Sequence, residues 1–232
     1  MTADSLETAL REGLAALGLA LPDAAVRQLL DYMAALERWN RVYNLTAVRA
    51  PAEMLTHHLL DSLAVVAPLR RHLGLPPVPA QAPEGLSAAP VRVLDVGSGG
   101  GLPGVVLAIA CPDLQVTCVD AVAKKAAFVG QVAASLRLPH LRGVHARVES
   151  LKGPFDLICS RAFASLADFA TWSRAALAPH GVWMAMKGRV PHDEMVALPA
   201  DVEVFHVEPL TVPGLEAERC LVWMRPVRAE SP

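Results

Sequence analysis

Residues 91–104 read VRVLDVGSGGGLPG, and this stretch decides the fold. A short apolar run ends in Asp95, and a cluster of glycines then extends to Gly104. Glycines let the backbone turn sharply and let a ligand approach it closely. A strand, an acidic residue, a glycine-rich turn and a helix, in this order, predict the nucleotide-sized pocket of an open α/β sheet. The N-terminus of the helix would offer free N–H groups to that pocket.

The acidic residue bears on which ligand the pocket takes. The spacing Gly99-x-Gly101-x-x-Gly104 fits the dinucleotide fingerprint, but Asp95 would repel a pyrophosphate and attract a cation. S-adenosylmethionine carries an ammonium and a sulfonium, which suit Asp95, and a carboxylate, which suits the helix N-terminus. The run DVGSGGG resembles the first motif of Rossmann-like methyltransferases. The sequence thus favours S-adenosylmethionine over NAD, with a purely structural glycine turn as the remaining alternative.

Composition sets further bounds. The chain has 232 residues, 53% of them hydrophobic, and a net charge of -2. This length suits one large domain, or one domain with a small appendage. We expect a cytoplasmic protein without membrane contact, because we find neither a spanning apolar run nor a signal peptide. The cysteines lack CxxC spacing and are expected to be reduced core residues; they are Cys111, Cys118, Cys159 and Cys220.

The order of apolar patterns predicts three regions. Residues 1–73 show helical periodicity and form an N-terminal helical extension, with a third helix from Pro51 to about Leu73. Residues 74–90 hold five prolines and form a linker or insertion. From residue 91 to 232, strands and helices alternate, and the chain ends in two strand-like runs, 202–210 and 219–224. This predicts an α/β, Rossmann-like doubly wound, mainly parallel sheet with a C-terminal antiparallel hairpin.

Three residue groups after the later strands face the expected crevice. Asp120 ends the second strand, where a carboxylate accepts the ribose hydroxyls of a nucleoside or caps the next helix. In the loop after the third strand, Glu149 can accept from an adenine amino group while the Val148 N–H donates to a ring nitrogen; alternatively, Glu149 is a solvated acid. Arg161 ends the fourth strand and binds the cofactor carboxylate or a substrate phosphate, or forms a structural ion pair.

Five segments together resemble the GidB family of bacterial small-subunit rRNA methyltransferases, which form 7-methylguanosine in the helix-18 loop of 16S rRNA. A late Glu218-Arg219 fits as well, and the resemblance spans about residues 36–225. The departures are Gly100 where the family can carry proline, Cys220 where histidine is expected, and a long 74–90 segment. The five segments are Trp39-Asn40-x-x-Tyr43-Asn44-Leu45-Thr46, His58-Leu59-Leu60-Asp61-Ser62-Leu63, DVGSGGGLPG, Ser160-Arg161-Ala162-Phe163-Ala164-Ser165-Leu166 and Met186-Lys187-Gly188-Arg189.

The resemblance implies the fold of class I methyltransferases that use S-adenosylmethionine, and 16S rRNA in the small ribosomal subunit as the substrate. Guanine N7 carries a lone pair and no proton, so in-line displacement at the sulfonium methyl needs no general base, and we assign no catalytic residue. The resemblance places the cofactor on Gly97, Leu102, Asp120, Val148, Glu149 and Arg161, and reasoning from the residues adds Asp95, Ser98 and Gly99.

Basic residues near the crevice are candidates for RNA contact. Lys187 and Arg189 follow the fifth strand and rank first, and Lys124 and Lys125 begin the helix after Asp120, although such groups often form only a solvated face. Phe163 stacks on a splayed guanine or belongs to the core.

Neighbouring His57 and His58 diverge on a helix, and a histidine with Asp61 makes too few ligands, so we expect no metal. We also expect a monomer. Three other functions stay open: a methyltransferase for another substrate, an NAD-dependent oxidoreductase, and a ribosome-assembly factor that binds the cofactor without catalysis.

Overall fold

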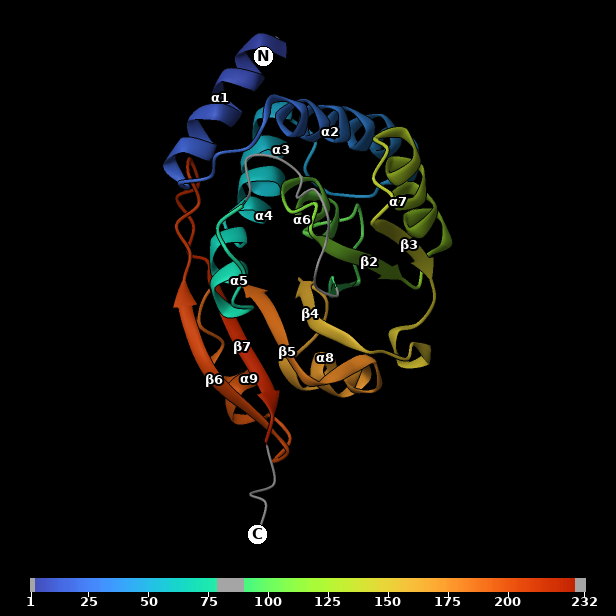
Figure 1. Cartoon of the computed structure of the whole chain (residues 1–232), viewed down its shortest axis with the longest axis vertical. Coiled ribbons are helices and arrows are strands. Elements are labelled where there is room, and N and C mark those ends of the chain that lie inside the picture. The colour runs from blue at the N-terminus through green and yellow to red at the C-terminus, as the bar shows by residue number, and fades with distance from the viewer. Residues whose placement is uncertain (1–2, 79–89, 228–232) are drawn as a thin grey trace.

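A seven-stranded sheet forms the centre of the protein (Figure 1). The computed structural model describes residues 3–78 and 90–227. The strand order is β3-β2-β1-β4-β5-β7-β6, in which β1 to β5 pair in parallel and β7 runs antiparallel to both β5 and β6. The predicted parallel sheet with a C-terminal hairpin is therefore confirmed. The strands are β1 Val91–Val96, β2 Leu114–Asp120, β3 Leu141–His145, β4 Phe155–Arg161, β5 Leu177–Lys187, β6 Val202–Pro209 and β7 Cys220–Pro226.

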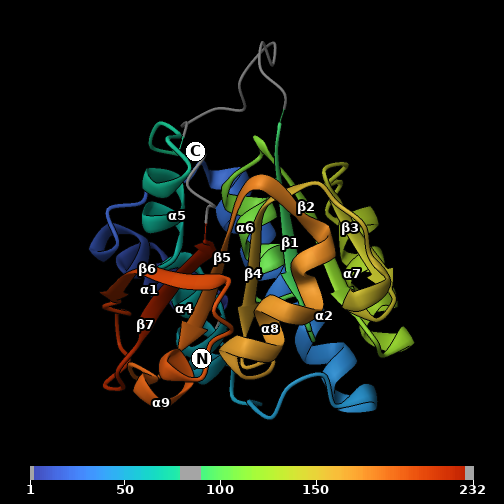
Figure 2. The ribbon, with the colours of Figure 1, turned by 90° about the horizontal axis from the view of Figure 1, so that it is seen from below.

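Helices cover both faces of this sheet (Figure 2). None of those in the described ranges has the length and apolar character to cross a membrane. In chain order they are α1 Ala3–Ala16, α2 Asp23–Tyr43, α3 Pro51–Met54, the π-helical segment η1 Leu55–Leu60, α4 Asp61–Leu63, α5 Val66–His72, α6 Gly104–Ala110, α7 Ala123–Ser135, the 3-10 turn η2 Val148–Ser150, α8 Leu166–Ser173, the 3-10 turn η3 Arg174–Ala176 and α9 His192–Val196.

The two faces of the sheet bury different sets of side chains, because successive residues of a strand point to opposite sides. On β1, Val93 belongs to the core under α2, α6 and α7, whereas Leu94 belongs to the core under α8. Both residues are fully buried. This alternation on a sheet covered on both sides is what the doubly wound architecture requires.

The N-terminal helices share a core with the sheet. Leu29 and Leu36 of α2 lie in the same apolar cluster as Val105 of α6 and Phe128 of α7. The predicted helix from Pro51 to about Leu73 exists as a nearly continuous helical stretch, with a π-helical segment inside it and a turn after α4. Most of the predicted 74–90 linker, residues 79–89, lies outside the described residues.

Strand β5 begins five residues earlier than the sequence predicts, at Leu177 instead of Val182. The pairing of β4 with β5 shifts register between Phe155 and Leu157, which pair with Leu177 and Val182. The intervening Pro179 has no N–H to donate to a sheet, so this part reads as a loop in the sequence although it forms a bulge.

Candidate functional site

Two cavities open at the carboxyl ends of the parallel strands. The first has a volume of about 480 Å³ and lies between the glycine-rich loop after β1 and the helices around η1. The second, of about 400 Å³, lies over the ends of β2 and β3. The walls of both include Gly97 and Ala162, so the two cavities adjoin at the ends of β1 and β4.

Glycine is required at two points of the loop. Gly97 has a φ of +65°, and a Cβ atom there would lie 2.2 Å from the ring of Phe163. At Gly104 a Cβ atom would lie 2.8 Å from the carboxylate of Asp95 and 2.4 Å from the sulfur of Cys118. The glycines therefore let a ring and a carboxylate approach the backbone to distances that a side chain would forbid.

Asp95 lies beneath this loop, and it does not line either of the two cavities. Its Oδ2 accepts a hydrogen bond of 2.9 Å from the N–H of Gly104, while its buried Oδ1 has no partner within the described part of the chain. Burial raises the pKa of Asp95 to about 7, and the bond from Gly104 and the charge of Arg161 oppose that rise. Asp95 is thus a carboxyl group that changes charge near neutral pH.

Three other predicted residues form the wall of the first cavity: Ser98, Gly99 and Leu102. The carbonyl of Ser98 accepts the N–H groups of Gly101 and Leu102, which closes the turn. The N–H of Gly99 donates to Oδ2 of Asp120 at 3.0 Å. The loop is therefore held by its own backbone and by the carboxylate at the end of β2.

Asp120 lines the second cavity and is 6% exposed. Its Oδ1 accepts from the N–H of Val122 at 2.8 Å, and its Oδ2 accepts from Gly99 and lies 3.8 Å from Nζ of Lys125. The alternative that Asp120 caps the next helix is not what the structure shows, because the N-cap of α7 is Val122 and the helix has no side-chain cap; the carboxylate instead holds the turn before α7. Because Asp120 lies in the cavity wall, its binding of ribose hydroxyls stays a prediction.

The rest of the second cavity combines backbone, acid and aromatic groups. Val148 is buried and Glu149 is exposed, and both line the cavity as the sequence predicts. Phe163 also lies here, edge-on to Trp172 with 5.9 Å between the ring centroids. Phe163 therefore belongs to the wall of the second cavity, and its stacking on a guanine stays a prediction.

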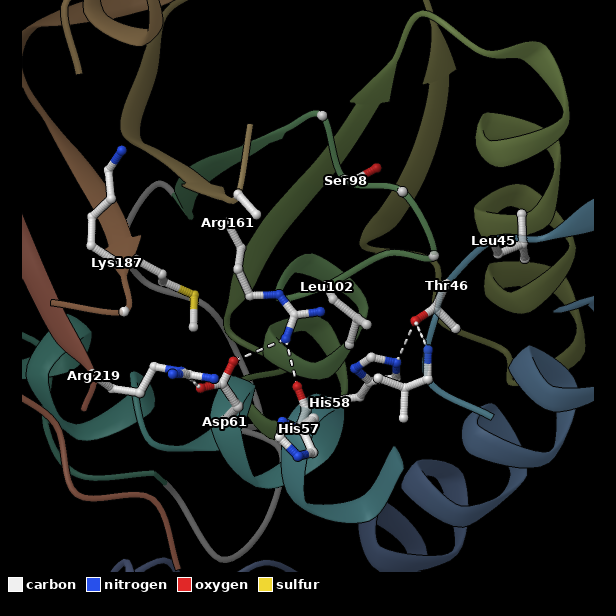
Figure 3. Close-up of a pocket in the computed structure, with 17 residues that line it drawn as sticks. Leu45, Thr46, His57, His58, Asp61, Ser98, Leu102, Arg161, Lys187 and Arg219 are labelled. Carbon is white, nitrogen blue, oxygen red and sulfur yellow. Dashed lines mark hydrogen bonds and ion pairs between the residues drawn. The ribbon is translucent and has the colours of Figure 1, made fainter. Parts of the chain in front are cut away.

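Arg161 projects from the end of β4 into the first cavity (Figure 3). Its Nη1 donates to the carbonyl of His57 at 2.7 Å and to Oδ2 of Asp61 at 2.9 Å. The other carboxylate oxygen of Asp61 accepts from Nε of Arg219 at 2.8 Å. The alternative of a structural ion pair is therefore present, and the same guanidinium also faces the cavity.

The π-helical segment supplies one of these contacts. In it, the N–H of Asp61 bonds to the carbonyls of Thr56 and His58. The carbonyl of His57, which an α-helix would pair with that N–H, instead accepts from Arg161. The wider turn thus joins the N-terminal helices to the end of β4, and π-helical segments are frequent at functional sites.

His58 is buried against the same cavity and is neutral at physiological pH. Burial and the charge of Arg161 lower its pKa to about 4. Its Nε2 lies 2.8 Å from the hydroxyl of Thr46, whose N–H donates to the side-chain oxygen of Asn40. Within residues 3–78 and 90–227 no group of three histidine, cysteine or acidic side chains is arranged to hold a metal ion.

The four predicted RNA-binding residues fall into two groups on either side of the crevice, since β1 and β4 separate β5 from β2. Lys187 donates to both oxygens of Glu194, at 2.8 and 3.0 Å, whereas Arg189 makes no hydrogen bond or ion pair in the described structure. Lys124 lies 5.8 Å from the ring centroid of Tyr43, and Lys125 faces Asp120.

Reasoning from single residues missed much of the first cavity. Its wall includes Thr46, Met186 and Arg219, to which the sequence assigned no role in a cofactor or RNA site. All three lie in segments that carried the family resemblance, so that resemblance was the signal that pointed to them. Trp172 in the second cavity had no such signal.

Comparisons with known proteins point to one family. The family model of rRNA small subunit methyltransferase G, GidB, matches residues 25–76 and 78–222. A ribosomal RNA small subunit methyltransferase G from Acidovorax sp. (strain JS42) is 66% identical over 224 residues, which cover 96% of each chain. Its namesake from Paracidovorax citrulli (strain AAC00-1) is 65% identical and covers 97% of this chain and 92% of its own.

Among solved structures, TrmN from Thermus thermophilus superposes with a TM-score of 0.51. The match covers 75% of this chain and 53% of that chain, at 19% sequence identity. At this identity the likeness concerns the fold alone.

Proposed function

The chain belongs to the GidB family, rRNA small subunit methyltransferase G, and on that basis we propose that it transfers a methyl group from S-adenosylmethionine to N7 of a guanine in the helix-18 loop of 16S rRNA. The observation that carries this proposal is the pair of adjoining cavities at the carboxyl ends of the parallel strands. Open α/β sheets bind their ligands at this edge.

The residues around the two cavities fit this cofactor. The missing side chain at Gly97 lets the ring of Phe163 lie against the loop where the cavities adjoin, and Asp120 offers a carboxylate beside the second one. We propose that Asp120, Val148 and Glu149 bind the nucleoside in the second cavity. The amino-acid end would then reach the first cavity, where Arg161 can pair with its carboxylate.

When bound, the cofactor supplies an electrophilic methyl group on a positively charged sulfur. Asp95 lies under the loop and favours that charge once its carboxyl group is ionised. The protein's main task is positioning, because a small misplacement of the acceptor reduces the rate strongly. Guanine N7 carries no proton, so the reaction does not require a general base. We therefore give no such role to His58, which is neutral and bonded to Thr46.

The experiment that tests this proposal combines binding with product analysis. Purified protein would be incubated with methyl-labelled S-adenosylmethionine and with small ribosomal subunits that lack the modification. We expect label in 16S rRNA, recovered as 7-methylguanosine from the helix-18 loop. Calorimetry with S-adenosylmethionine and with NADH would accompany it. Label in another nucleoside would overturn the position, and binding of NADH alone would overturn the cofactor.

A further inference from the structure

Asp61 holds two arginines at once. Its side chain is 3% exposed, and each carboxylate oxygen accepts from a different guanidinium: Oδ2 from Arg161 and Oδ1 from Arg219. A buried carboxylate is stable only when its oxygens have such partners. Because Asp61 sits on the helical stretch next to η1, it fixes both arginines relative to the N-terminal helices (Figure 3).

The two arginines lie on either side of the Asp61 carboxylate in the wall of the first cavity, and each adjoins a different neighbouring cavity. Arg161 follows β4, next to Ala162, which the cavity shares with the nucleoside side. Arg219 precedes β7, and it also lines a neighbouring groove of about 840 Å³ together with Lys187 and Gly188. The Arg219 end of the cavity is therefore continuous with a groove that the nucleoside side does not share.

This arrangement separates a donor end from an acceptor end. Methyl transfer requires the acceptor nitrogen on the side of the methyl group away from the sulfur. With the nucleoside in the second cavity, the acceptor approaches from the side of Arg219 and the neighbouring groove. The groove gives a polynucleotide an open path to that end of the cavity.

Arg219 retains donor capacity toward this end. Its Nε is bonded to Asp61 and its Nη1 to the carbonyl of Glu218 at 2.8 Å. In the part of the chain that the structure describes, Nη2 makes no hydrogen bond. The edge of guanine next to N7 carries the acceptor O6, whereas adenine carries a donor amino group there. A guanidinium that donates to O6 alone leaves N7 free for the methyl group.

We propose that Arg219, held in place by Asp61, distinguishes guanine from adenine at the acceptor end by donating from Nη2 to O6. This inference rests on the proposed function. Asp61 is a positioning residue, because it acts through Arg219 and Arg161.

The test compares two purines that both offer N7. Small subunits would carry guanine or 2-aminopurine, which lacks O6, at the target position, and methylation of each would be timed. We expect wild-type protein to prefer guanine by about ten- to a hundredfold. In R219Q the preference should fall to near unity, whereas R219K should retain part of it. S-adenosylmethionine affinity, measured by calorimetry, should stay within about twofold of wild type in R219Q.

R225Q is the matched control, because Arg225 lies on β7, the strand that Arg219 precedes, and pairs with a carboxylate, Glu203, but lines neither cavity. It should retain the full guanine preference. An unchanged preference in R219Q would overturn the inference and leave the proposed function intact. Loss of cofactor binding in R219Q would contradict the placement of Arg219 at the acceptor end. Failure of wild-type protein to methylate guanine would overturn the proposed function and this inference together.

A second variant, D61N, tests the positioning role. Loss of the carboxylate releases both arginines, so we expect weaker cofactor binding through Arg161 and a smaller guanine preference through Arg219 in the same protein. A purely structural role would lower stability and leave the guanine preference of the folded fraction at the wild-type value. That result would show that Asp61 does not contribute to the preference for guanine.

Discussion

The hydroxyl of Tyr32, in the middle of helix α2, donates a hydrogen bond of 2.6 Å to the carbonyl of Gly100 in the glycine-rich loop. Tyr32 is fully buried, and Leu36 from the next turn of α2 lies where a Cβ atom of Gly100 would be. An N-terminal helix, 68 residues away in the sequence, therefore supports the loop that forms the first cavity.

The first prediction concerns this bond. Tyr32→Phe keeps the ring and removes the donor, which leaves a buried carbonyl unpaired. We expect the free energy of unfolding to fall by about 1 kcal/mol, and S-adenosylmethionine affinity to fall by up to about fivefold as the loop loosens. Denaturant titration and calorimetry measure the two effects.

Tyr43→Phe is the matched control, since Tyr43 also lies on α2 and is 39% exposed. It should match wild type in both measurements. Tyr32→Phe with unchanged cofactor affinity would show that α2 does not support the binding loop.

The second prediction follows from the raised pKa of Asp95, about 7. The carboxyl group is largely neutral below that pH and ionised above it, so it attracts a cationic cofactor only at the higher pH. We expect S-adenosylmethionine to bind up to about tenfold more tightly at pH 7.5 than at pH 6. In Asp95→Asn, whose amide oxygen can still accept from Gly104, affinity should be lower and lose this dependence.

S-adenosylhomocysteine serves as the matched ligand, because it lacks the sulfonium charge. Its affinity should depend less on pH and on the charge at position 95. Equal affinity of wild type and Asp95→Asn for S-adenosylmethionine at every pH would contradict an attraction between the Asp95 carboxylate and the cationic cofactor.

The third prediction concerns stability and His58. Its folded pKa of about 4 lies below the usual 6.5, so the unfolded chain binds a proton first as the pH falls. The stability that His58 contributes is complete above about pH 6.5 and is lost progressively toward pH 4, by roughly 3 kcal/mol. His58→Gln should flatten this part of the stability profile, which denaturant titrations at several pH values would measure.

The comparison of wild type with His58→Gln separates this effect from Asp95, whose raised pKa acts with the opposite sign over much of the same range. His180→Gln, at an exposed site, should leave the profile as it is in wild type. A His58→Gln profile parallel to wild type from pH 4 to 6.5 would contradict the assignment.

The fourth prediction concerns the RNA-binding residues. Arg189 makes no hydrogen bond or ion pair in the described structure, whereas the ammonium of Lys187 is already held by Glu194. Arg189→Ala should therefore weaken RNA binding and reduce the salt dependence of the affinity by about one counterion. Lys187→Ala should have a smaller effect on binding. Neither should change affinity for the cofactor.

Lys152→Ala removes an exposed charge before the start of β4, at the opposite end of that strand from the site, and should leave RNA binding unchanged. Filter binding over a range of salt concentrations would compare the three variants. An Arg189→Ala slope equal to that of Lys152→Ala would remove Arg189 from the RNA surface.

The sequence predicts the fold well because the determinants are local. Apolar strands alternate with helices, and a glycine cluster around Gly97 follows the first strand, which together specify a parallel sheet. No helix is predicted between the last two strands, which specifies the terminal hairpin. The predicted start of β5 was wrong, because Pro179 is typical of a loop and the bulge depends on pairing with β4.

The site was predictable only in part, for a different reason. Glycines and acids at strand ends can be recognised from the local sequence pattern. The structure brings Gly97, Gly99 and Asp120 together as the sequence predicts. Asp61 and Arg219 are 158 residues apart, and neither has a local pattern that predicts their pairing. Contacts between the N-terminal helices and the sheet arise from packing, which a single sequence does not display.

The central claim is that the two cavities adjoining at Gly97 and Ala162 form one site, with the nucleoside on one side and the reacting group on the other. A crystal structure with S-adenosylhomocysteine tests it most directly. The account predicts the adenosine beside Asp120, Glu149 and Phe163, and the amino-acid carboxylate on Arg161. A nucleoside found in the cavity of Asp61 and Arg219 instead would contradict the account.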